Sequence, residues 1–432
     1  MTQFLIGVII FILTFALIVS EKIPDTLSAL LGGFLMIAVG IISEEKAFES
    51  IDMEVIFLLI GMMIIVHIMS ETGVFQWVAI RLAQFVRGEP FLLLILLMLA
   101  TALFSAFLDN VTTIMLIVPV SIILTEQLKL DPIPFLLMEV FASNIGGAAT
   151  LIGDPPNILI ATAGEISFNE FMFNMGPLVL IDMLFLIIIS WFLFGRKMKV
   201  SRDLKARIME IDPNRALRDN KILMKSGIVM GLVILGFLTN SITNFGIAAT
   251  AMSGAVVLMI IAKQDPEEIF KTVEWKTLFF FIGLFILVQG VVEIGVLKIL
   301  GQKMIKVTHG NLKITSALIL WISTFVSAIV NNIPYTTTII PLIKNELIPN
   351  IMKLHPELTK KTIEYALWWA LSVGACFGGN ATIVGASANV VATGIAAKSG
   401  RKISFFEFLK YGVLITILTV IVSNIYIYWR YL

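Results

Sequence analysis

The sequence predicts an all-α polytopic membrane protein with two inverted-topology repeats, each with five crossings plus a re-entrant hairpin and a broken helix. Three observations support this prediction: an apolar composition, an internal repeat, and polar motifs inside apolar segments. Of the 432 residues, 58% are hydrophobic and 14% are charged, and the mean hydropathy is +0.97. A soluble domain carries about 25% charged residues. Most of this chain must therefore face lipid or other buried helices.

Composition also excludes several classes of protein. The net charge is +1 and no basic tract is interleaved with aromatic residues, so we expect no nucleic acid partner. The single Cys376 excludes a disulfide framework and a cysteine-based metal cluster. No H-E-x-x-H, G-x-S-x-G or Walker A pattern is present. We therefore expect neither an enzyme nor a cofactor, and ATP hydrolysis would require a separate ATPase partner.

Apolar runs predict the membrane crossings. Two further apolar stretches, 91–124 and 314–343, are interrupted by the polar pairs Asp109-Asn110 and Asn331-Asn332. We predict that both are re-entrant hairpins with the polar tip at mid-membrane, because two full spans each would have very short arms. Segments 73–87 and 294–306 mix charge with apolar residues and are expected along the membrane interface. The ten predicted crossings lie near 4–20, 26–42, 53–70, 133–163, 175–194, 226–240, 247–262, 277–292, 363–396 and 408–428.

The two halves of the chain repeat in one register. An offset of 222 positions places the first half on the second, and the offset becomes 232 after a ten-residue insertion. Because five crossings per half is an odd number, the halves would be inverted relative to each other, as in many secondary transporters. Pairs of equal residues include Gly61 and Gly283, Gly73 and Gly295, Ser105 and Ser327, Asn110 and Asn332, Pro119 and Pro341, Gly147 and Gly379, Thr150 and Thr382, and Asn157 and Asn389.

These signals divide the chain into three parts. Residues 1–194 form the first repeat, with hairpin 91–124 and broken helix 133–163; residues 226–432 form the second, with hairpin 314–343 and broken helix 363–396. The linker 195–225 is basic and is expected in the cytoplasm, which puts both termini outside a prokaryotic inner or plasma membrane. Its ten basic residues are Arg196, Lys197, Lys199, Arg202, Lys205, Arg207, Arg215, Arg218, Lys221 and Lys225.

Four polar motifs, at the two hairpin tips and the two broken helices, carry the candidate site. Gly and Pro free backbone amides and carbonyls, which lipid tolerates only where they line a cavity or bind something. Freed carbonyls with Asn, Ser and Thr oxygens suit Na⁺, expected near Asp109, Asn110 and Asn332, whereas helix N-termini suit an anion. The candidate substrate- or ion-binding residues are Ser105, Asp109, Asn110, Thr112, Thr113, Asn144, Gly146, Gly147, Thr150, Gly153, Asp154, Asn157, Ser327, Asn331, Asn332, Thr336, Gly378, Gly379, Asn380, Thr382, Gly385, Ser387 and Asn389.

Two carboxylates lie inside these motifs, Asp109 and Asp154. A lone carboxylate at membrane depth costs roughly several kcal/mol, so such residues mark ion pathways or buried partners. They are interpreted as cation ligands or proton carriers, with helix caps or partners of a buried donor as the alternative. Glu139 and Asp182 also fall within apolar runs, and each is interpreted as a functional carboxylate or, alternatively, as a residue near the membrane interface.

The motifs 109–113, 144–157 and 378–391 closely resemble the family of the melanosomal P protein and its prokaryotic relatives. That family is similar to other members of the ion transporter superfamily, namely the arsenite-efflux proteins (arsenical pump membrane protein) and the citrate transporter-like symporters of dicarboxylates and citrate. The resemblance implies a scaffold domain, a transport domain with two opposed hairpins, a homodimer and an elevator-like mechanism.

The leading hypothesis is therefore a secondary active transporter coupled to Na⁺ or H⁺. Its substrate would be a small ion or anion: arsenite or antimonite, an inorganic anion, or a carboxylate. An anion channel on the same fold and a Na⁺/H⁺ antiporter are the alternatives. Asn110 and Asn332 match the central Asn of the Ser-Asn-Thr tips in the dicarboxylate symporters, but the rest of that motif is missing here. No cysteine lies at the tips to ligate arsenite.

Overall fold

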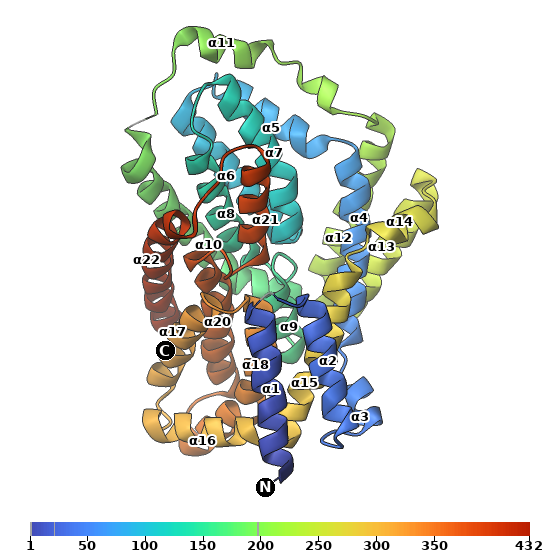
Figure 1. Cartoon of the computed structure of the whole chain (residues 1–432), viewed down its shortest axis with the longest axis vertical. Coiled ribbons are helices and arrows are strands. Elements are labelled where there is room, and N and C mark those ends of the chain that lie inside the picture. Colours follow the sequence, from blue (N-terminus) through green and yellow to red (C-terminus); the bar gives the residue numbers. More distant parts are fainter. Residues whose placement is uncertain (1, 21, 197) are drawn as a thin grey trace.

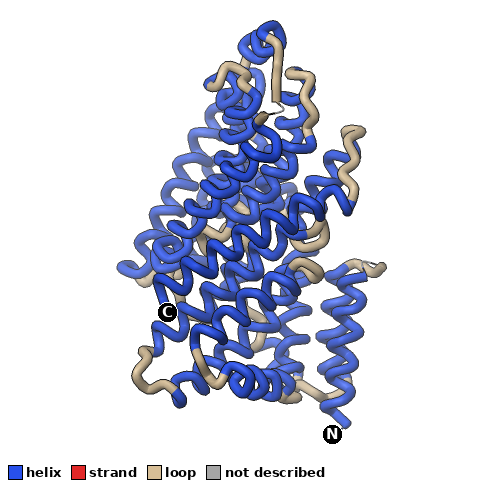
Figure 2. Tube along the Cα trace, turned by 90° about the vertical axis from the view of Figure 1, so that its left-hand side faces the viewer, coloured by secondary structure: helices blue, strands red, loops and turns tan. Residues whose placement is uncertain are grey.

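The computed structural model describes residues 2–20, 22–196 and 198–432, and all regular structure within them is helical (Figures 1 and 2). Eight helices are long and apolar enough to cross a membrane. The predicted all-α, multi-pass class is confirmed. The eight are α1 (Thr2–Ser20), α4 (Met53–Glu71), α6 (Pro90–Phe107), α7 (Asn110–Gln127), α10 (Phe168–Ser190) with its π-helical extension η1 (Trp191–Gly195), α12 (Asn220–Thr243), α15 (Trp275–Glu293) and α22 (Phe405–Tyr431).

Shorter helices complete the bundle. Four of them are apolar: α2 (Asp25–Ala38), α8 (Ile133–Gly147), α13 (Ile247–Ala262) and α17 (Leu312–Ser327). The remaining elements are α3 (Glu44–Glu49), α5 (Val74–Phe85), α9 (Pro155–Ala163), α11 (Arg202–Glu210), η2 (Pro213–Ala216), α14 (Pro266–Thr272), α16 (Val296–Thr308), α18 (Asn332–Leu342), η3 (Ile343–Leu347), α19 (Ile348–Leu354), α20 (Lys360–Gly378), η4 (Gly379–Ala381) and α21 (Ser387–Lys398).

Large apolar side chains are exposed along the outer helices. Leu5 on α1, Leu180 on α10, Leu232 on α12 and Ile425 on α22 are examples. Contact with water would cost free energy over this whole surface, whereas hydrocarbon chains of a bilayer cover it without cost. The surface therefore fits a protein embedded in lipid.

The helices form two packed groups. In one group, which we call the scaffold, α2 packs on α15, α4 packs on α13, and α1 and α12 flank these pairs. In the other group, α6 packs on α8 and α17 packs on α20, with α10 and α22 outside them. Figure 1 shows the scaffold on the right and the second group on the left.

Glycines bring the scaffold helices into backbone contact. A methyl group at Gly61 on α4 would lie 2.6 Å from the carbonyl carbon of Ala251 on α13, and one at Gly283 on α15 would lie 2.5 Å from that of Ala29 on α2. The two contacts are equivalent in the repeat, because Gly283 lies 222 positions after Gly61 and Ala251 lies 222 positions after Ala29. Small residues let membrane helices approach closely, so dispersion contacts stabilise the pairs.

Both predicted hairpin regions turn at the predicted polar pair. Helix α6 ends at Phe107 and α7 begins at Asn110; α17 ends at Ser327 and α18 begins at Asn332. Since α6 and α7 have 18 residues each and meet the length for a crossing, length alone does not separate hairpins from full spans. The second arms cross over between the halves, because α7 packs on α21 and α18 packs on α9.

The broken helices are interrupted where the Gly-rich motifs lie. Residues 148–154 separate α8 from α9, and residues 382–386 separate η4 from α21. The residues before α9 and α21 have nearly the same extended conformation: Asp154 has φ −145° and ψ 130°, and Ala386 has φ −146° and ψ 144°. The two halves thus place equivalent residues in equivalent backbone conformations.

The basic linker crosses the end of the molecule opposite the N-terminus, over α5 (Figure 1). Lys205 pairs with Glu89 at 2.5 Å, and Gln84 donates to the carbonyl of Ile211 at 2.6 Å. Helix α12 begins six residues earlier than predicted, because Asp219 caps it. Hydrogen bonds from the N–H of Ile222 and, to a smaller extent, from the N–H of Lys221 hold the pKa of Asp219 below its usual range. Of the ten basic residues, Lys197 lies outside the described residues.

Replacement of Gly61 by Ala should destabilise the scaffold. The added methyl overlaps the α13 backbone, and overpacking of this kind costs about 1–3 kcal/mol. The matched control is Gly231→Ala on α12, where the methyl meets nothing within 4 Å. Thermal unfolding in detergent should show a lower midpoint for Gly61→Ala and an unchanged or slightly higher one for Gly231→Ala. Equal midpoints for the two variants would contradict the close contact.

Candidate transport site

Four helix N-termini meet at one cavity of about 210 Å³. Their first residues are Asn110 of α7, Pro155 of α9, Asn332 of α18 and Ser387 of α21, and all four line this cavity, which we call the central cavity. Each N-terminus carries the positive end of a helix dipole, although α9 begins with Pro155 and Pro156, which have no N–H to donate. The arrangement therefore concentrates positive electrostatic potential from the backbone at one place inside an apolar bundle.

The two hairpin helices are capped by equivalent residues. The two carboxylate oxygens of Asp109 accept hydrogen bonds from the N–H and the hydroxyl of Thr112, at 2.8 and 2.5 Å. The Oδ1 of Asn331 accepts from the N–H of Ile333 at 3.2 Å, while its amide donates to the hydroxyl of Ser387 at 3.0 Å. Asp109 is thus a helix cap that also lines the cavity, and its role as a cation ligand or proton carrier stays a prediction.

Asn144 joins the halves beneath the tips. Its Oδ1 accepts from the amide of Asn110 at 3.2 Å, and its own amide donates to Asn380 at 2.8 Å and Asn389 at 2.9 Å. All four side chains are buried. Within the described residues, the amide nitrogen of Asn380 has no partner. A cluster of amides with nearly every group paired fixes the relative position of three motifs.

Asp154 makes the second contact between the halves. Its two carboxylate oxygens lie 3.3 and 3.1 Å from the amide nitrogen of Asn332, which donates to them. Both residues are buried at the edge of the central cavity. The thiol of Cys376 also lies within hydrogen-bonding reach of Asp154, and it donates to the side-chain oxygen of Asn157 at 3.5 Å.

The remaining motif residues mainly hold the broken backbone. The amide of Asn157 donates to the carbonyls of Gly147 and Thr150, and the amide of Asn389 donates to those of Gly379 and Thr382. Hydrogen bonds to otherwise unpaired carbonyls remove the cost of leaving them in a low-dielectric interior. In the same way, Ser105 and Thr150 donate to Ser143 and Ala106, and Ser327 and Thr382 donate to Ala375 and Ala328.

Glycine is required where the chain turns back on itself. A methyl group at Gly147 would lie 2.8 Å from the carbonyl oxygen of Gly153, and one at Gly385 would lie 2.7 Å from that of Gly379. Gly146 and Gly378 similarly lack room, since they abut the backbones of Ala102 and Thr324. These glycines therefore allow the close backbone packing at the breaks, and their predicted contact with a ligand stays a prediction.

The predicted residues fall into three sets. Six line the central cavity: Asp109, Asn110, Asp154, Asn331, Asn332 and Ser387. Thr113 and Thr336 are buried with unpartnered hydroxyls in the described structure, and the rest bind backbone or each other. Asp109, Asn110 and Asn332, where Na⁺ is expected, all face this one cavity, although no group of three or more His, Cys, Asp or Glu residues able to hold a metal occurs among residues 2–20, 22–196 and 198–432.

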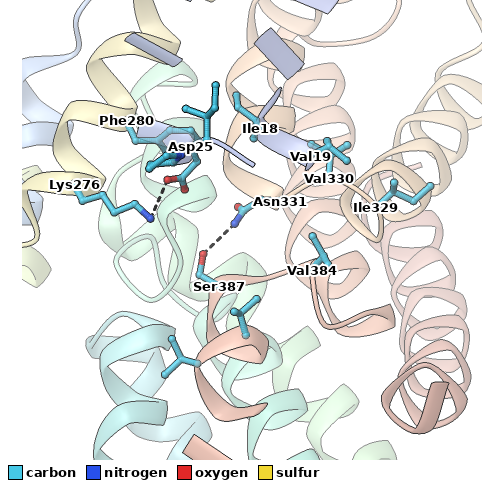
Figure 3. A pocket seen from close by; sticks show the side chains of 14 residues that line it. Ile18, Val19, Asp25, Lys276, Phe280, Ile329, Val330, Asn331, Val384 and Ser387 are labelled. Carbon is cyan, nitrogen blue, oxygen red and sulfur yellow. Dashed lines mark hydrogen bonds and ion pairs between the residues drawn. The ribbon is translucent and has the colours of Figure 1, made fainter. Parts of the chain in front are cut away.

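The scaffold supplies a wall that the sequence did not reveal. Asp25, Thr26, Glu274, Lys276 and Phe280 line the central cavity opposite the tips. Lys276 pairs with Asp25 at 2.9 Å, and Figure 3 shows this ion pair beside the hydrogen bond between Asn331 and Ser387. Charged residues at the start of membrane helices are commonplace, so no sequence signal set these apart.

An adjoining cavity of about 360 Å³ continues from the same wall. It shares Asp25, Lys276, Phe280, Asn331 and Ser387 with the central cavity, and its other lining residues are mostly apolar, such as Ile18 and Val330 (Figure 3). The two cavities therefore share the wall that carries the Asp25–Lys276 ion pair.

A helical membrane bundle with half-helices meeting at a buried polar cavity defines the class of membrane transporters. The chain belongs to the citrate transporter (CitMHS) family, which matches residues 15–358. It is 43% identical to a 46 kDa membrane protein of Mycobacterium leprae, over 99% of each chain. It is 42% identical to an uncharacterized transporter of Mycobacterium tuberculosis, over 99% of this chain and 98% of the relative.

The relationship extends to the P protein and to a known fold. The human P protein is 32% identical over 95% of this chain, which spans 58% of that longer protein. The crystal structure of the YdaH transporter from Alcanivorax borkumensis, described as having an unusual topology, aligns over 99% of this chain and 98% of that one, with a TM-score of 0.61 at 12% identity. The family confirms a transporter rather than an enzyme, and the P protein resemblance is confirmed.

Asn144→Ala should destabilise the protein, because it removes both amide donors to Asn380 and Asn389. Each buried carbonyl left without a partner costs about 1–3 kcal/mol. Asn240→Ala is the control, since its amide makes one hydrogen bond, to Phe245, at a partly exposed position. Thermal unfolding in detergent should show a clear decrease in midpoint for Asn144→Ala only. Unchanged stability would mean that the amide cluster does not hold the halves together.

Proposed function

We propose that this protein is a secondary active transporter that moves a small anion across the membrane, coupled to Na⁺ or H⁺. The observation that carries the proposal is the convergence of four helix N-termini on the central cavity. Half-helix N-termini are the usual way in which transporters bind an anionic group at mid-membrane.

The second broken helix offers the freest donors. Helix α21 has no side-chain cap, and its first residue, Ser387, lines both cavities. The ammonium group of Lys276 is the one cation that lines the central cavity within the described residues. Together they suit a carboxylate, and the family description makes citrate the first substrate to test.

Charge in the central cavity supports a coupled cation. Four carboxylates line it, Asp25, Asp109, Asp154 and Glu274, against the single Lys276. An anion entering this cavity would meet a net negative field, which raises its free energy unless a cation binds with it. Na⁺ beside Asp109, Asn110 and Asn332 would supply that charge, and a proton on one of the carboxylates would do so equally.

The two walls of the central cavity come from different helix groups, and this arrangement supports an elevator-like mechanism. Helices α2, α4 and α15 of the scaffold form one wall, and the tips and half-helices form the other. Sliding of the second group along the scaffold would carry the cavity from one membrane face to the other. A homodimer, a cytoplasmic linker and outside termini belong to the same proposal.

Purified protein in liposomes should take up labelled citrate when a Na⁺ or H⁺ gradient is imposed, and should not do so without a gradient. Coupling to an ion gradient is the property that separates a transporter from a channel on the same fold. Citrate, arsenite, phosphate and chloride would be compared, with protein-free liposomes as the control. Rapid gradient-independent flux of an anion would favour the channel, and no flux of any of the four would contradict the proposal.

Na⁺ should stabilise the detergent-purified protein if it is the coupling ion. Na⁺ at about 100 times its dissociation constant would add about 2.7 kcal/mol, because only the folded state binds it. Asp109→Asn, which keeps an acceptor for Thr112 but loses the charge, should abolish the effect. The control, Glu268→Gln, alters an exposed ion pair with Lys271 and should leave it intact. If Na⁺ stabilises both variants equally, and no more than K⁺ does, no Na⁺ binds at Asp109.

A further inference from the structure

A second kind of carboxyl group lies away from the central cavity. Glu139 on α8 is 0% exposed. Its Oε1 accepts one hydrogen bond, from the hydroxyl of Ser121 on α7 at 2.5 Å. Its Oε2 is buried with no partner among the described residues. The neighbouring residues on α8, from Phe135 to Phe141, are all buried and otherwise apolar.

An ionised carboxylate does not fit these surroundings. An ionised group taken out of water needs a counter-charge or several donors, and a single hydroxyl supplies neither. A proton on the carboxyl removes the charge and leaves a neutral group that one hydroxyl can partner. The geometry therefore favours the protonated form of Glu139 in this conformation.

No cation faces Glu139 from the helices packed on α8. Neither α6 nor η4 carries an ionisable residue, and the ionisable groups inside the other helices are Asp182 of α10, Cys376 of α20 and the tyrosines. The remaining charges lie near helix ends, and none makes a hydrogen bond or ion pair with Glu139. These are Glu126 of α7, Glu170 of α10, Lys360, Lys361 and Glu364 of α20, Lys398 of α21, and Glu407, Lys410 and Arg430 of α22.

Glu139 is also connected to the transport site. It lies five residues before Asn144 on α8, and its one partner, Ser121, lies on the second arm of the first hairpin. Pro119 interrupts the hydrogen-bond ladder of that arm just before Ser121. Movement of the hairpin arm against the broken helix would therefore change the only hydrogen bond of this carboxyl group.

We propose that Glu139 is a proton-binding site of the transport cycle. Its carboxyl group is protonated in the conformation described here and loses the proton to water when the hairpin arm moves. The inference rests on the proposed transport function and makes H⁺ one of the coupling ions. Asp182 has a similar geometry, with one bond from Ser423 at 3.0 Å and an unpartnered Oδ1. It joins α10 to α22, outside the four motifs, and therefore serves as the matched control.

Infrared titration of the protein in lipid tests proton binding without any substrate. The wild type should show a protonated carboxyl band that disappears as the pH is raised. Glu139→Gln should lack this band, Glu139→Asp should restore a titrating band, and Asp182→Asn should keep the band of Glu139. If the folded Glu139→Gln variant keeps every titrating carboxyl band of the wild type, the proposal is wrong.

Citrate uptake into liposomes under a pH gradient tests coupling. One proton per citrate lets a gradient of one pH unit drive about tenfold accumulation. Glu139→Gln should retain citrate exchange between equal pools but lose this accumulation, whereas Asp182→Asn should keep it. Undiminished accumulation by Glu139→Gln would overturn the proposal. If the wild type itself moves no citrate, the transport proposal loses its first substrate, and the infrared titration still decides the role of Glu139.

Discussion

The hydrogen bonds from the amide of Asn144 to Asn380 and Asn389 are the interaction on which the rest of the site depends. A bilayer offers no partner for a broken helix, so each interruption must be satisfied by other parts of the same protein. Here each break is satisfied by its own asparagine, Asn157 or Asn389. The side chain of Asn144 then joins the first broken helix to the second and, through Asn110, to the first hairpin tip. The halves cannot separate without exposing unpaired amides to an apolar interior, and that cost holds the transport site together.

Polar residues of this protein do two different jobs. Asn157 and Asn389 use their amides to replace backbone partners lost at the breaks, while Asp154 and Asn332 face the central cavity and hold each other across the halves. A motif that looks uniform in sequence is thus divided by geometry into supporting and cavity-lining residues. Because the supporting residues pair the carbonyls freed at the breaks, four helix N-termini can point at one cavity without leaving those carbonyls unpaired in the interior.

The carboxyl groups also separate into two kinds. Those at the central cavity have partners suited to a charge, such as Lys276 for Asp25 and Thr112 for Asp109. Glu139 and Asp182 each have one hydroxyl and one unpartnered oxygen, deep between helices. The first kind suits binding of a substrate and its cation, and the second suits a neutral, protonated group. Of Glu139 and Asp182, it is Glu139 that bonds to a hairpin arm, through Ser121, so its protonation can be coupled to movement of that arm.

The sequence by itself determined the membrane class and the positions of the hairpin turns and helix breaks, whereas the structure showed which motif residues support the broken backbone. Gly, Pro and Asn inside an apolar run are local signals, because each changes what its own backbone can do. Only the tertiary structure decided that Asn332 meets Asp154 and that Asp25 and Lys276 pair at the cavity wall facing the tips. Such pairs are far apart in the chain, and their distances depend on packing that no local pattern encodes.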